Sequence, residues 1–320
     1  MDTIFDNTES AFSLKSDSEL ERAYFLFRMI KSEPLVKIGT AATNFALKAH
    51  LPVEGLIRST VFDHFCGGIT EEDCMSTIDN MYTKEVHAVL DYSVEGAEVE
   101  SQFDLAMNKT LANIDFAKEK LSIPFAVFKP SGFGRLALYQ KVSECIELNE
   151  SESAEWQTVK NRYNTVSKHA FDNDVKLLID AEESWMQGSA DDLIEEMMVK
   201  YNKKKVIVFG TLQLYRWDRL DYLKDLHARA KAQGFYVGMK LVRGAYMEKE
   251  RERAEEKGYK SPICDTKEDT DANYDTVVRY MLDHINEMEI FEGTHNEEST
   301  TLLMQLIDEH KLSKDDQRIW

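Results

Sequence analysis

The stretch Tyr236–Tyr246, YVGMKLVRGAY, decides how the rest of the chain is interpreted. Its first half alternates between two faces, as a β-strand does. It ends with three chemically reactive side chains, Lys240, Arg243 and Tyr246, around a Gly-Ala pair. Cations and an aromatic ring at the carboxyl end of a strand suit an anionic, planar ligand. A buried strand with solvated charges at its exit is the simpler alternative for this segment taken alone.

The composition indicates a soluble globular protein that does not bind nucleic acid. The 320 residues are 43% hydrophobic and 30% charged, with a net charge of -19. This charge disfavours nucleic acid and unaided binding to an anionic membrane. No apolar run approaches the ~20 residues that cross a bilayer. The four cysteines form no C-x-x-C pair, and the acidic N-terminal segment lacks a signal or transit pattern, so we expect a cytoplasmic protein.

The hydrophobic pattern of the chain changes at about residue 121. Residues 1–121 predict helices only, the first of them opened by a capping box at Ser18 and Glu21. Residues 122–320 alternate apolar strands with amphipathic helices. We therefore expect a helical N-terminal arm over 1–121, followed by a parallel α/β domain over 122–320.

Two parallel architectures compete for residues 122–320. An open doubly wound sheet needs a glycine-rich turn after its first strand, and only Gly132-x-Gly134 is present. A (β/α)8 barrel instead collects functional side chains where its strands end. The five predicted strand exits carry such side chains, namely Lys129, Asp180, Gln213, the run 240–246, and His295. The barrel is therefore preferred, and five units predict that it is incomplete in this chain.

The residue types at these exits leave more than one chemistry open. Metal-assisted hydrolysis could use Asp180, Glu182 and His295, but no paired-histidine spacing supports a metal site. Nucleophilic catalysis lacks a G-x-S-x-G motif, and Cys264 has no obvious base. A flat polyanionic cofactor uses the residues best. A flavin and pyridoxal phosphate both fit, with Lys129 as the Schiff-base lysine of the second.

Four segments together resemble the flavin-dependent proline dehydrogenase family, in its mitochondrial-type or single-function bacterial form. They are, in this order, KLLIDAEES, GTLQLY, GMKLVRGAYMEKERERAEEKGYKSPI and GTHNEES. The match covers roughly residues 125–320, and its most specific part is LVRGAY with the long charged run that follows. K-L-V-R-G-A-Y here replaces the R-L-V-K-G-A-Y of many bacterial members.

The resemblance implies an enzyme that oxidises L-proline to Δ1-pyrroline-5-carboxylate, with hydride transfer to FAD and electrons passed to a membrane quinone. It also implies peripheral attachment to the inner face of a bacterial membrane and a downstream pyrroline-5-carboxylate dehydrogenase as a partner. A mitochondrial matrix location is less expected without a transit pattern. The alternatives are an FAD-dependent dehydrogenase of hydroxyproline or another cyclic imino acid, and a flavin-less relative that acts as a binding scaffold.

The resemblance also assigns roles to the residues at the strand ends. Asp180 and Lys240 match the acid and the cation beside the flavin, and they are the expected catalytic residues. Lys129 and Tyr246 match the substrate side of the site. The expected cofactor-binding residues are Ala181, Gln213, Val242, Arg243, Gly244, Ala245, Thr294, His295 and Asn296. No metal ligand is expected.

The C-terminal end of the sequence departs from the family pattern. Family members continue to a helix whose paired arginines hold the proline carboxylate, and residues 1–320 contain no such pair. Ile319-Trp320 has the pattern of the start of another strand. We therefore expect these residues to be part of a longer protein, with the flavin side of the site in this part and the carboxylate-binding groups in the remainder.

Overall fold

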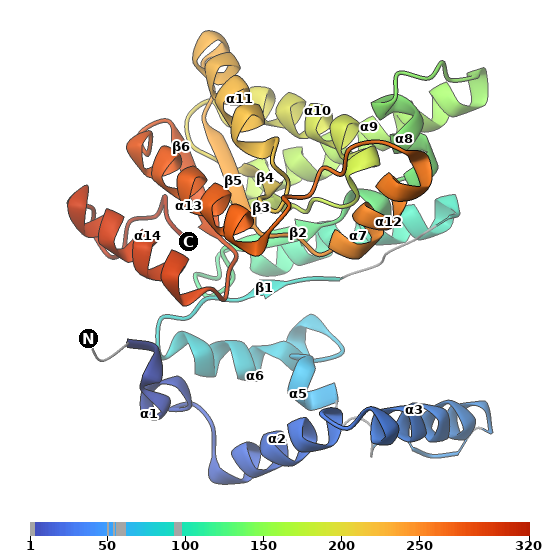
Figure 1. The fold of residues 1–320 in the computed structure, drawn as a ribbon, viewed down its shortest axis with the longest axis vertical. Coiled ribbons are helices and arrows are strands. Elements are labelled where there is room, and N and C mark those ends of the chain that lie inside the picture. Colours follow the sequence, from blue (N-terminus) through green and yellow to red (C-terminus); the bar gives the residue numbers. More distant parts are fainter. Residues whose placement is uncertain (1–3, 50, 54, 56–61, 93–97) are drawn as a thin grey trace. The chain divides into compact units, whose positions relative to one another are not determined.

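The chain divides into two compact units, Met1–Ala88 and Val89–Trp320, a division that falls before the predicted boundary at residue 121. The computed structural model describes residues 4–49, 51–53, 55, 62–92 and 98–320. Figure 1 shows helices in the first unit and a curved sheet with helices in the second.

The described elements of the first unit are helical. They are η1 Ile4–Asp6, α1 Thr8–Ala11, α2 Asp17–Ile30, α3 Glu33–Lys48, α5 Asp63–Phe65 and α6 Glu71–Tyr82. Helix α2 begins with a capping box made by Ser16 and Glu19, in which each side chain binds the backbone N–H of the other. The predicted box at Ser18 and Glu21 is wrong, because S-x-x-E occurs twice in this segment and the earlier copy starts the helix.

The second unit is built on a six-stranded parallel sheet whose strands follow one another in chain order. The strands are β1 Val89–Leu90, β2 Phe125–Phe128, β3 Lys176–Ile179, β4 Val208–Gln213, β5 Val237–Val242 and β6 Met288–Glu292. The helical elements are α7 Glu100–Ala117, η3 Pro130–Gly132, α8 Leu136–Ser143, α9 Glu150–Asn173, α10 Ser184–Tyr201, α11 Arg219–Gln233, α12 Met247–Lys257, α13 Lys267–Asp283 and α14 Glu297–Glu309. The sheet curls into half of a barrel (Figure 1), which confirms the predicted incomplete α/β barrel with a helical N-terminal region.

Strand β1 corrects one part of the prediction. Residues up to 121 were expected to form helices only, but Val89 and Leu90 pair in parallel with Phe125 and Ala126 of β2. Two residues are too short a run to show the alternation that identifies a strand. The described part of the sheet therefore holds six strands, one more than the five predicted.

The inner face of the curved sheet changes from apolar to polar along the strands. Its buried cluster consists of Phe125, Val127, Leu178, Val206 and Phe209, with Phe291 and Trp320 packed against it. Side chains alternate along a strand, so Phe209, Thr211 and Gln213 of β4 share this face. The aromatic cluster therefore lies below polar side chains at the carboxyl ends of the strands.

The last residues of the chain extend the sheet beyond β6. Ile319 forms a parallel bridge with Ile290. The backbone N–H of Trp320 donates to the carbonyl of Ile290 at 3.0 Å, and the N–H of Glu292 donates to the carbonyl of Trp320 at 2.7 Å. This pairing agrees with the expectation that Ile319-Trp320 has the character of a strand start.

Glu250 of α12 fixes this helix to the first turn of α10. Its side chain is fully buried, and its carboxylate accepts hydrogen bonds from the backbone N–H and the hydroxyl of Ser184, both at 2.6 Å. The carboxylate thus binds an N–H group at the positive end of α10.

We expect Glu250→Gln to lower the free energy of unfolding by about 1–2 kcal/mol. The neutral amide has one acceptor oxygen in place of the two charged carboxylate oxygens that accept from Ser184. Urea unfolding followed by circular dichroism measures the change. The control is Glu255→Gln on the exposed side of the same helix, and an equal loss in both variants would contradict the assignment.

Candidate active site

A cavity of about 420 Å³ opens at the carboxyl ends of the strands. Its lining consists of Lys129, Asp180, Ala181, Thr211, Gln213, Lys240, Val242, Arg243, Gly244, Ala245, Tyr246, Gly293, Thr294 and His295. Parallel strands place their carboxyl ends at one edge of the sheet, so residues distant in sequence meet there. The volume lies in the range of small-molecule sites.

Every site residue predicted from the sequence lines this cavity except Asn296. The side-chain oxygen of Asn296 instead caps helix α14. Thr211 and Gly293 also line the cavity and were not predicted. Thr211 lies two residues before Gln213 and pairs with Lys240 across the sheet, so strand alternation alone could have identified it. The functional roles assigned to the predicted residues stay predictions.

Asp180 lies between two lysines at the centre of the lining. Its Oδ1 is 2.6 Å from Nζ of Lys240, and its Oδ2 is 3.5 Å from Nζ of Lys129. The three side chains are 16–19% exposed, so they are shielded from bulk water yet reach the cavity. Two ammonium groups around one carboxylate leave an excess positive charge, which favours an anionic ligand.

Gln213 presents a buried hydrogen-bond acceptor to the cavity. Its Nε2 donates to the carbonyl of Ala181 at 3.4 Å. Its Oε1 is buried and accepts no hydrogen bond from the described residues. A buried acceptor left in this state costs about 1–3 kcal/mol. The atom therefore fits a ligand that carries an N–H group into the cavity.

Arg243 is held in place by helices α13 and α14. Its Nε donates to Asp271 at 2.8 Å, its Nη1 to the hydroxyl of Thr294 at 2.7 Å, and its Nη2 to the hydroxyl of Ser299 at 3.0 Å. The guanidinium carbon also lies 4.4 Å from the ring centroid of Tyr274. The sequence placed Arg243 in the site, but gave no indication of this support.

The backbone of the run 242–245 follows a path that requires glycine at position 244. Gly244 has a φ of +129°, and a Cβ there would lie 2.4 Å from the ring of Tyr215. The N–H of Tyr215 donates to the carbonyl of Arg243 at 2.8 Å, which continues the β4–β5 pairing past the strand ends. This side of the cavity is therefore formed by a fixed, closely packed main chain.

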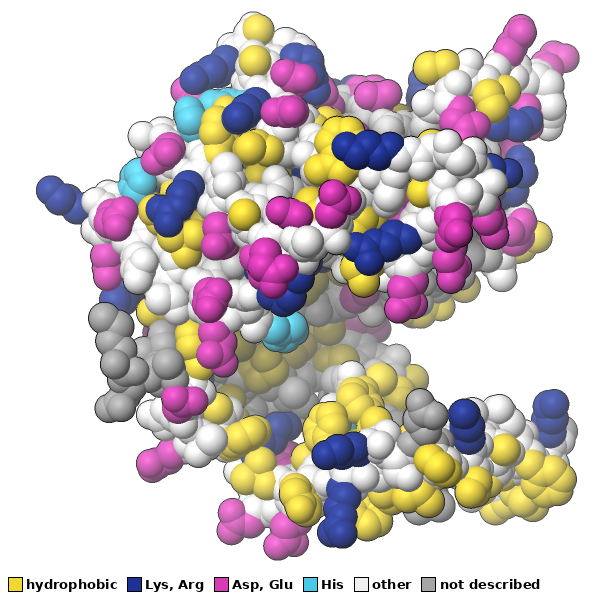
Figure 2. Space-filling model, viewed as in Figure 1, with side chains coloured by type: hydrophobic (Ala, Val, Ile, Leu, Met, Phe, Trp, Pro, Cys, Tyr) yellow, Lys and Arg dark blue, Asp and Glu magenta, His cyan; other side chains and the backbone are white. Residues whose placement is uncertain are grey.

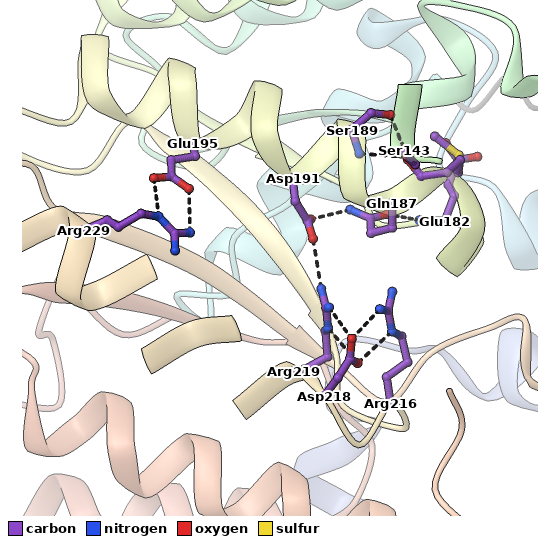
Figure 3. Close-up of polar contacts among 11 residues, drawn as sticks. Ser143, Glu182, Gln187, Ser189, Asp191, Glu195, Arg216, Asp218, Arg219 and Arg229 are labelled. Carbon is purple, nitrogen blue, oxygen red and sulfur yellow. Dashed lines mark hydrogen bonds and ion pairs between the residues drawn. The ribbon is translucent and has the colours of Figure 1, made fainter. Parts of the chain in front are cut away.

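A buried polar network links side chains of α10 to side chains that follow β4 (Figure 3). Gln187 donates to Asp191 at 2.8 Å, and Asp191 accepts from Arg219 at 2.9 Å. Arg219 and Arg216 both donate to Asp218. Burial tends to raise the pKa of Asp218. The hydrogen bonds from the two arginines outweigh burial and lower this pKa to about 2. The network joins α10 to the connection that follows β4.

Glu182 supports the loop after β2. Its carboxylate accepts hydrogen bonds from the backbone N–H of Ser131 at 2.7 Å and from the hydroxyl of Ser131 at 2.6 Å. Burial raises its pKa, against the effect of these bonds. Within the described residues, no three His, Cys, Asp or Glu side chains come together as metal ligands. Metal-assisted hydrolysis therefore has no support in the described part of the chain.

Glu292 ends β6 directly before Gly293 of the cavity lining. Burial raises its pKa to about 7, although nearby Arg243 opposes the rise. One of its carboxylate oxygens is buried without a hydrogen-bond partner among the described residues. The folded protein therefore holds the proton of Glu292 more tightly than the unfolded chain does. The contribution of the neutral carboxyl to stability is complete below pH 4.5 and is lost as the pH rises through about 7.

We expect Glu292→Gln to match the parent near pH 5 and to be more stable by about 1–3 kcal/mol at pH 8, because the amide cannot ionise. Urea unfolding at both pH values measures the difference, with the exposed Glu309→Gln as control. A stability difference that does not change with pH would rule out ionisation of Glu292 as the cause.

The fold and the cavity together define a class of protein, an incomplete parallel α/β barrel with a positively charged small-molecule site at its strand ends. Within that class, the chain belongs to the proline dehydrogenase family. The family model described as proline dehydrogenase matches residues 74–320.

Two known proteins that are similar to this chain are longer than it. The carbapenem antibiotics biosynthesis protein CarD of Pectobacterium carotovorum subsp. carotovorum is 36% identical over 253 residues, which cover 78% of this chain and 66% of CarD. The mitochondrial proline dehydrogenase 1 of Drosophila melanogaster is 35% identical over 183 residues, which cover 54% of this chain and 27% of that protein. The chain therefore spans less than two thirds of either relative.

A solved structure with the same fold is proline utilization A (PutA) from Bdellovibrio bacteriovorus, inactivated by N-propargylglycine. It matches with a TM-score of 0.72 and 16% sequence identity, over 97% of this chain and 33% of that one. At this identity, the similarity shows the fold alone.

Proposed function

We propose that this chain forms the cofactor-binding part of an FAD-dependent proline dehydrogenase. The observation that carries the proposal is Asp180 between Lys240 and Lys129 in the strand-end cavity of a proline dehydrogenase family member. FAD, when bound, would supply the electron acceptor for oxidation of L-proline to Δ1-pyrroline-5-carboxylate, and a membrane quinone would then take the electrons.

The residues of the cavity fit FAD by their chemistry. The buried Oε1 of Gln213 can accept a hydrogen bond from an N–H group of a flavin ring. Gly244 and Ala245 line the cavity without large side chains, so a flat group could lie against the main chain there. Thr294 and His295 add hydrogen-bonding groups for the adenosine half of the cofactor.

The lysines act as fixed cations in this proposal. A cation beside the cofactor favours the negative charge that reduction adds there, and Asp180 holds the ammonium of Lys240 at one position. Lys129 and Tyr246 would contact the substrate. Pyridoxal phosphate is less well supported, because it needs a neutral lysine amine, and both lysines are ion-paired with Asp180.

The absorbance of the purified full-length protein tests the proposal. We expect a flavin spectrum, either as purified or after addition of FAD and removal of the excess. We expect the spectrum to bleach anaerobically with L-proline. A protein that stays colourless with added FAD would overturn the assignment.

The same experiment separates the remaining alternatives. Bleaching by trans-4-hydroxy-L-proline and not by L-proline would assign a hydroxyproline dehydrogenase. A flavin spectrum of the full-length protein that neither imino acid bleaches would keep the cofactor site and reject oxidation of these substrates. Absence of flavin in a folded protein would favour the binding scaffold.

A further inference from the structure

The pairing of β2 with β3 ends at two residues of the cavity lining. The strands pair in parallel as far as Phe128 and Ile179, and the same register places Lys129 opposite Asp180. The N–H of Asp180 donates to the carbonyl of Phe128 at 3.0 Å. Pro130 follows Lys129 and has no N–H, so it cannot make the next hydrogen bond of the ladder. The end of this strand pair therefore needs support from a side chain.

Glu182 supplies that support. Its carboxylate accepts hydrogen bonds from the N–H of Ser131 at 2.7 Å and from the hydroxyl of Ser131 at 2.6 Å. Figure 2 shows Asp and Glu side chains spread over the visible surface of the second unit, whereas Glu182 and Ser131 are each 3% exposed. A buried carboxylate is costly unless it is hydrogen-bonded. Both oxygens of Glu182 bind the same residue, so they fix the position of Ser131.

The turn that contains Ser131 also holds Lys129. The N–H of Gly132 donates to the carbonyl of Lys129, and the N–H of Phe133 donates to the carbonyl of Pro130, both at 2.9 Å. The backbone of Lys129 is extended, with φ -103° and ψ 137°, as is typical of a residue before proline. Lys129 therefore has little backbone freedom of its own, and a shift of Ser131 moves Lys129 with it.

Gln187 of α10 fixes the backbone of Glu182 (Figure 3). The N–H of Glu182 donates to Oε1 of Gln187 at 2.9 Å, and Nε2 of Gln187 donates to Asp191 at 2.8 Å. The carboxylate of Asp191, which also accepts from Arg219, needs donors. The amide of Gln187 is therefore oriented with its oxygen toward Glu182, and the buried network continues from α11 to the turn that follows β2.

We infer that Glu182 is a positioning residue for Lys129. By binding Ser131 where the ladder ends, Glu182 keeps the ammonium of Lys129 beside Asp180, with Nζ and Oδ2 3.5 Å apart. Lys129 lines the cavity and Glu182 does not, so Glu182 acts through the turn. The inference rests on the proposed function only in the substrate role of Lys129, and its first test needs no turnover.

Chemical labelling of Lys129 in the full-length protein tests this inference. Acetic anhydride modifies an uncharged amine, so an ammonium held beside a carboxylate reacts slowly. We expect Glu182→Gln to raise the labelling rate of Lys129 about threefold to tenfold, because a neutral amide with one acceptor oxygen binds Ser131 less well. Mass spectrometry of the peptide that contains Lys129 gives the rate. An unchanged rate in the folded variant would overturn the inference.

Glu250→Gln is the matched control for this experiment. Glu250 is also buried, and its carboxylate also accepts from the N–H and the hydroxyl of one serine, Ser184. Its contact lies at the first turn of α10 and not at the turn after β2. Lys129 should therefore be labelled in this variant at the rate of the parent. An equal increase in both variants would show a general loosening of the fold and would reject a positioning role.

Ser131→Ala decides the question if Glu182→Gln does not fold. This variant loses the hydroxyl contact and keeps the N–H contact. The ring of Phe133 stacks on Phe128, with the centroids 4.1 Å apart, and holds the far end of the turn. We expect Ser131→Ala to raise the labelling rate of Lys129 about twofold to threefold. Labelling at the rate of the parent would contradict the inference.

A double-mutant cycle with Lys129 separates positioning from general stability. We expect Glu182→Gln to lower kcat/KM for L-proline about threefold to tenfold in the parent, and less than about twofold in a Lys129→Met background. The same factor in both backgrounds would give Glu182 a purely structural role and overturn the inference. A parent whose flavin L-proline does not bleach would instead refute the proposed function, and the labelling experiment would still decide the role of Glu182.

Discussion

Replacement of Lys240 by alanine is expected to slow the reduction of bound FAD by L-proline about 100-fold. The variant removes the ammonium group that lies 2.6 Å from Oδ1 of Asp180. Among the described residues, Asp180 then keeps its ion pair with Lys129, at 3.5 Å, and a less compensated carboxylate faces the cavity. Removal of one preorganised stabilising group at a site of developing negative charge typically costs a factor of about 100–1,000 in rate.

The flavin reduction potential gives a readout that does not require turnover. We expect the Lys240→Ala variant to retain FAD but to show a potential lower by about 30 mV or more, which for two electrons corresponds to about 1.4 kcal/mol. Lys240→Arg, which keeps the positive charge, is the control and should stay close to the parent. Unchanged potential and turnover in Lys240→Ala would remove Lys240 from the proposed mechanism.

The carboxyl ends of the strands were predictable because two features of the sequence coincide there. Strands β2 to β6 each combine an apolar run with polar residues directly after it, and parallel pairing brings these residues to one edge of the sheet. Lys129, Asp180 and Gln213 were identified in this way, and all three line the cavity. Strand β1 lacks the apolar run, since only Val89 and Leu90 pair with the sheet.

The side chains that hold the cavity residues in place were not predictable. Arg243 depends on Asp271 of α13 and Ser299 of α14, and neither follows a strand. Which helix side chain meets which strand end depends on the angle and register of helix packing, and these are not encoded in any local pattern. The buried network of Gln187, Asp191 and Arg219 was missed for the same reason.

That network gives the largest stability effect that we expect. Arg219→Met should lower the free energy of unfolding by about 3–5 kcal/mol, because it leaves a buried carboxylate without its cation. Arg219 donates to Asp191 at 2.9 Å, and the two side chains are only 10% and 11% exposed. Burial already raises the pKa of Asp191, and Arg219 is the first of the groups that oppose this rise.

Arg229→Met provides a matched control on the same helix pair. Arg229 also belongs to α11 and also binds a carboxylate of α10, with two hydrogen bonds of 2.8 Å to Glu195 (Figure 3). Its side chain is 42% exposed, so water can solvate Glu195 after the substitution, and we expect a loss of about 1 kcal/mol or less. Arg219→Met also removes two hydrogen bonds to Asp218, but Asp218 keeps its two hydrogen bonds from Arg216. The main difference between the two variants is therefore the buried carboxylate of Asp191. Urea unfolding of the two variants compares the effects directly, and equal losses would show that desolvation of Asp191 does not control the stability of the network.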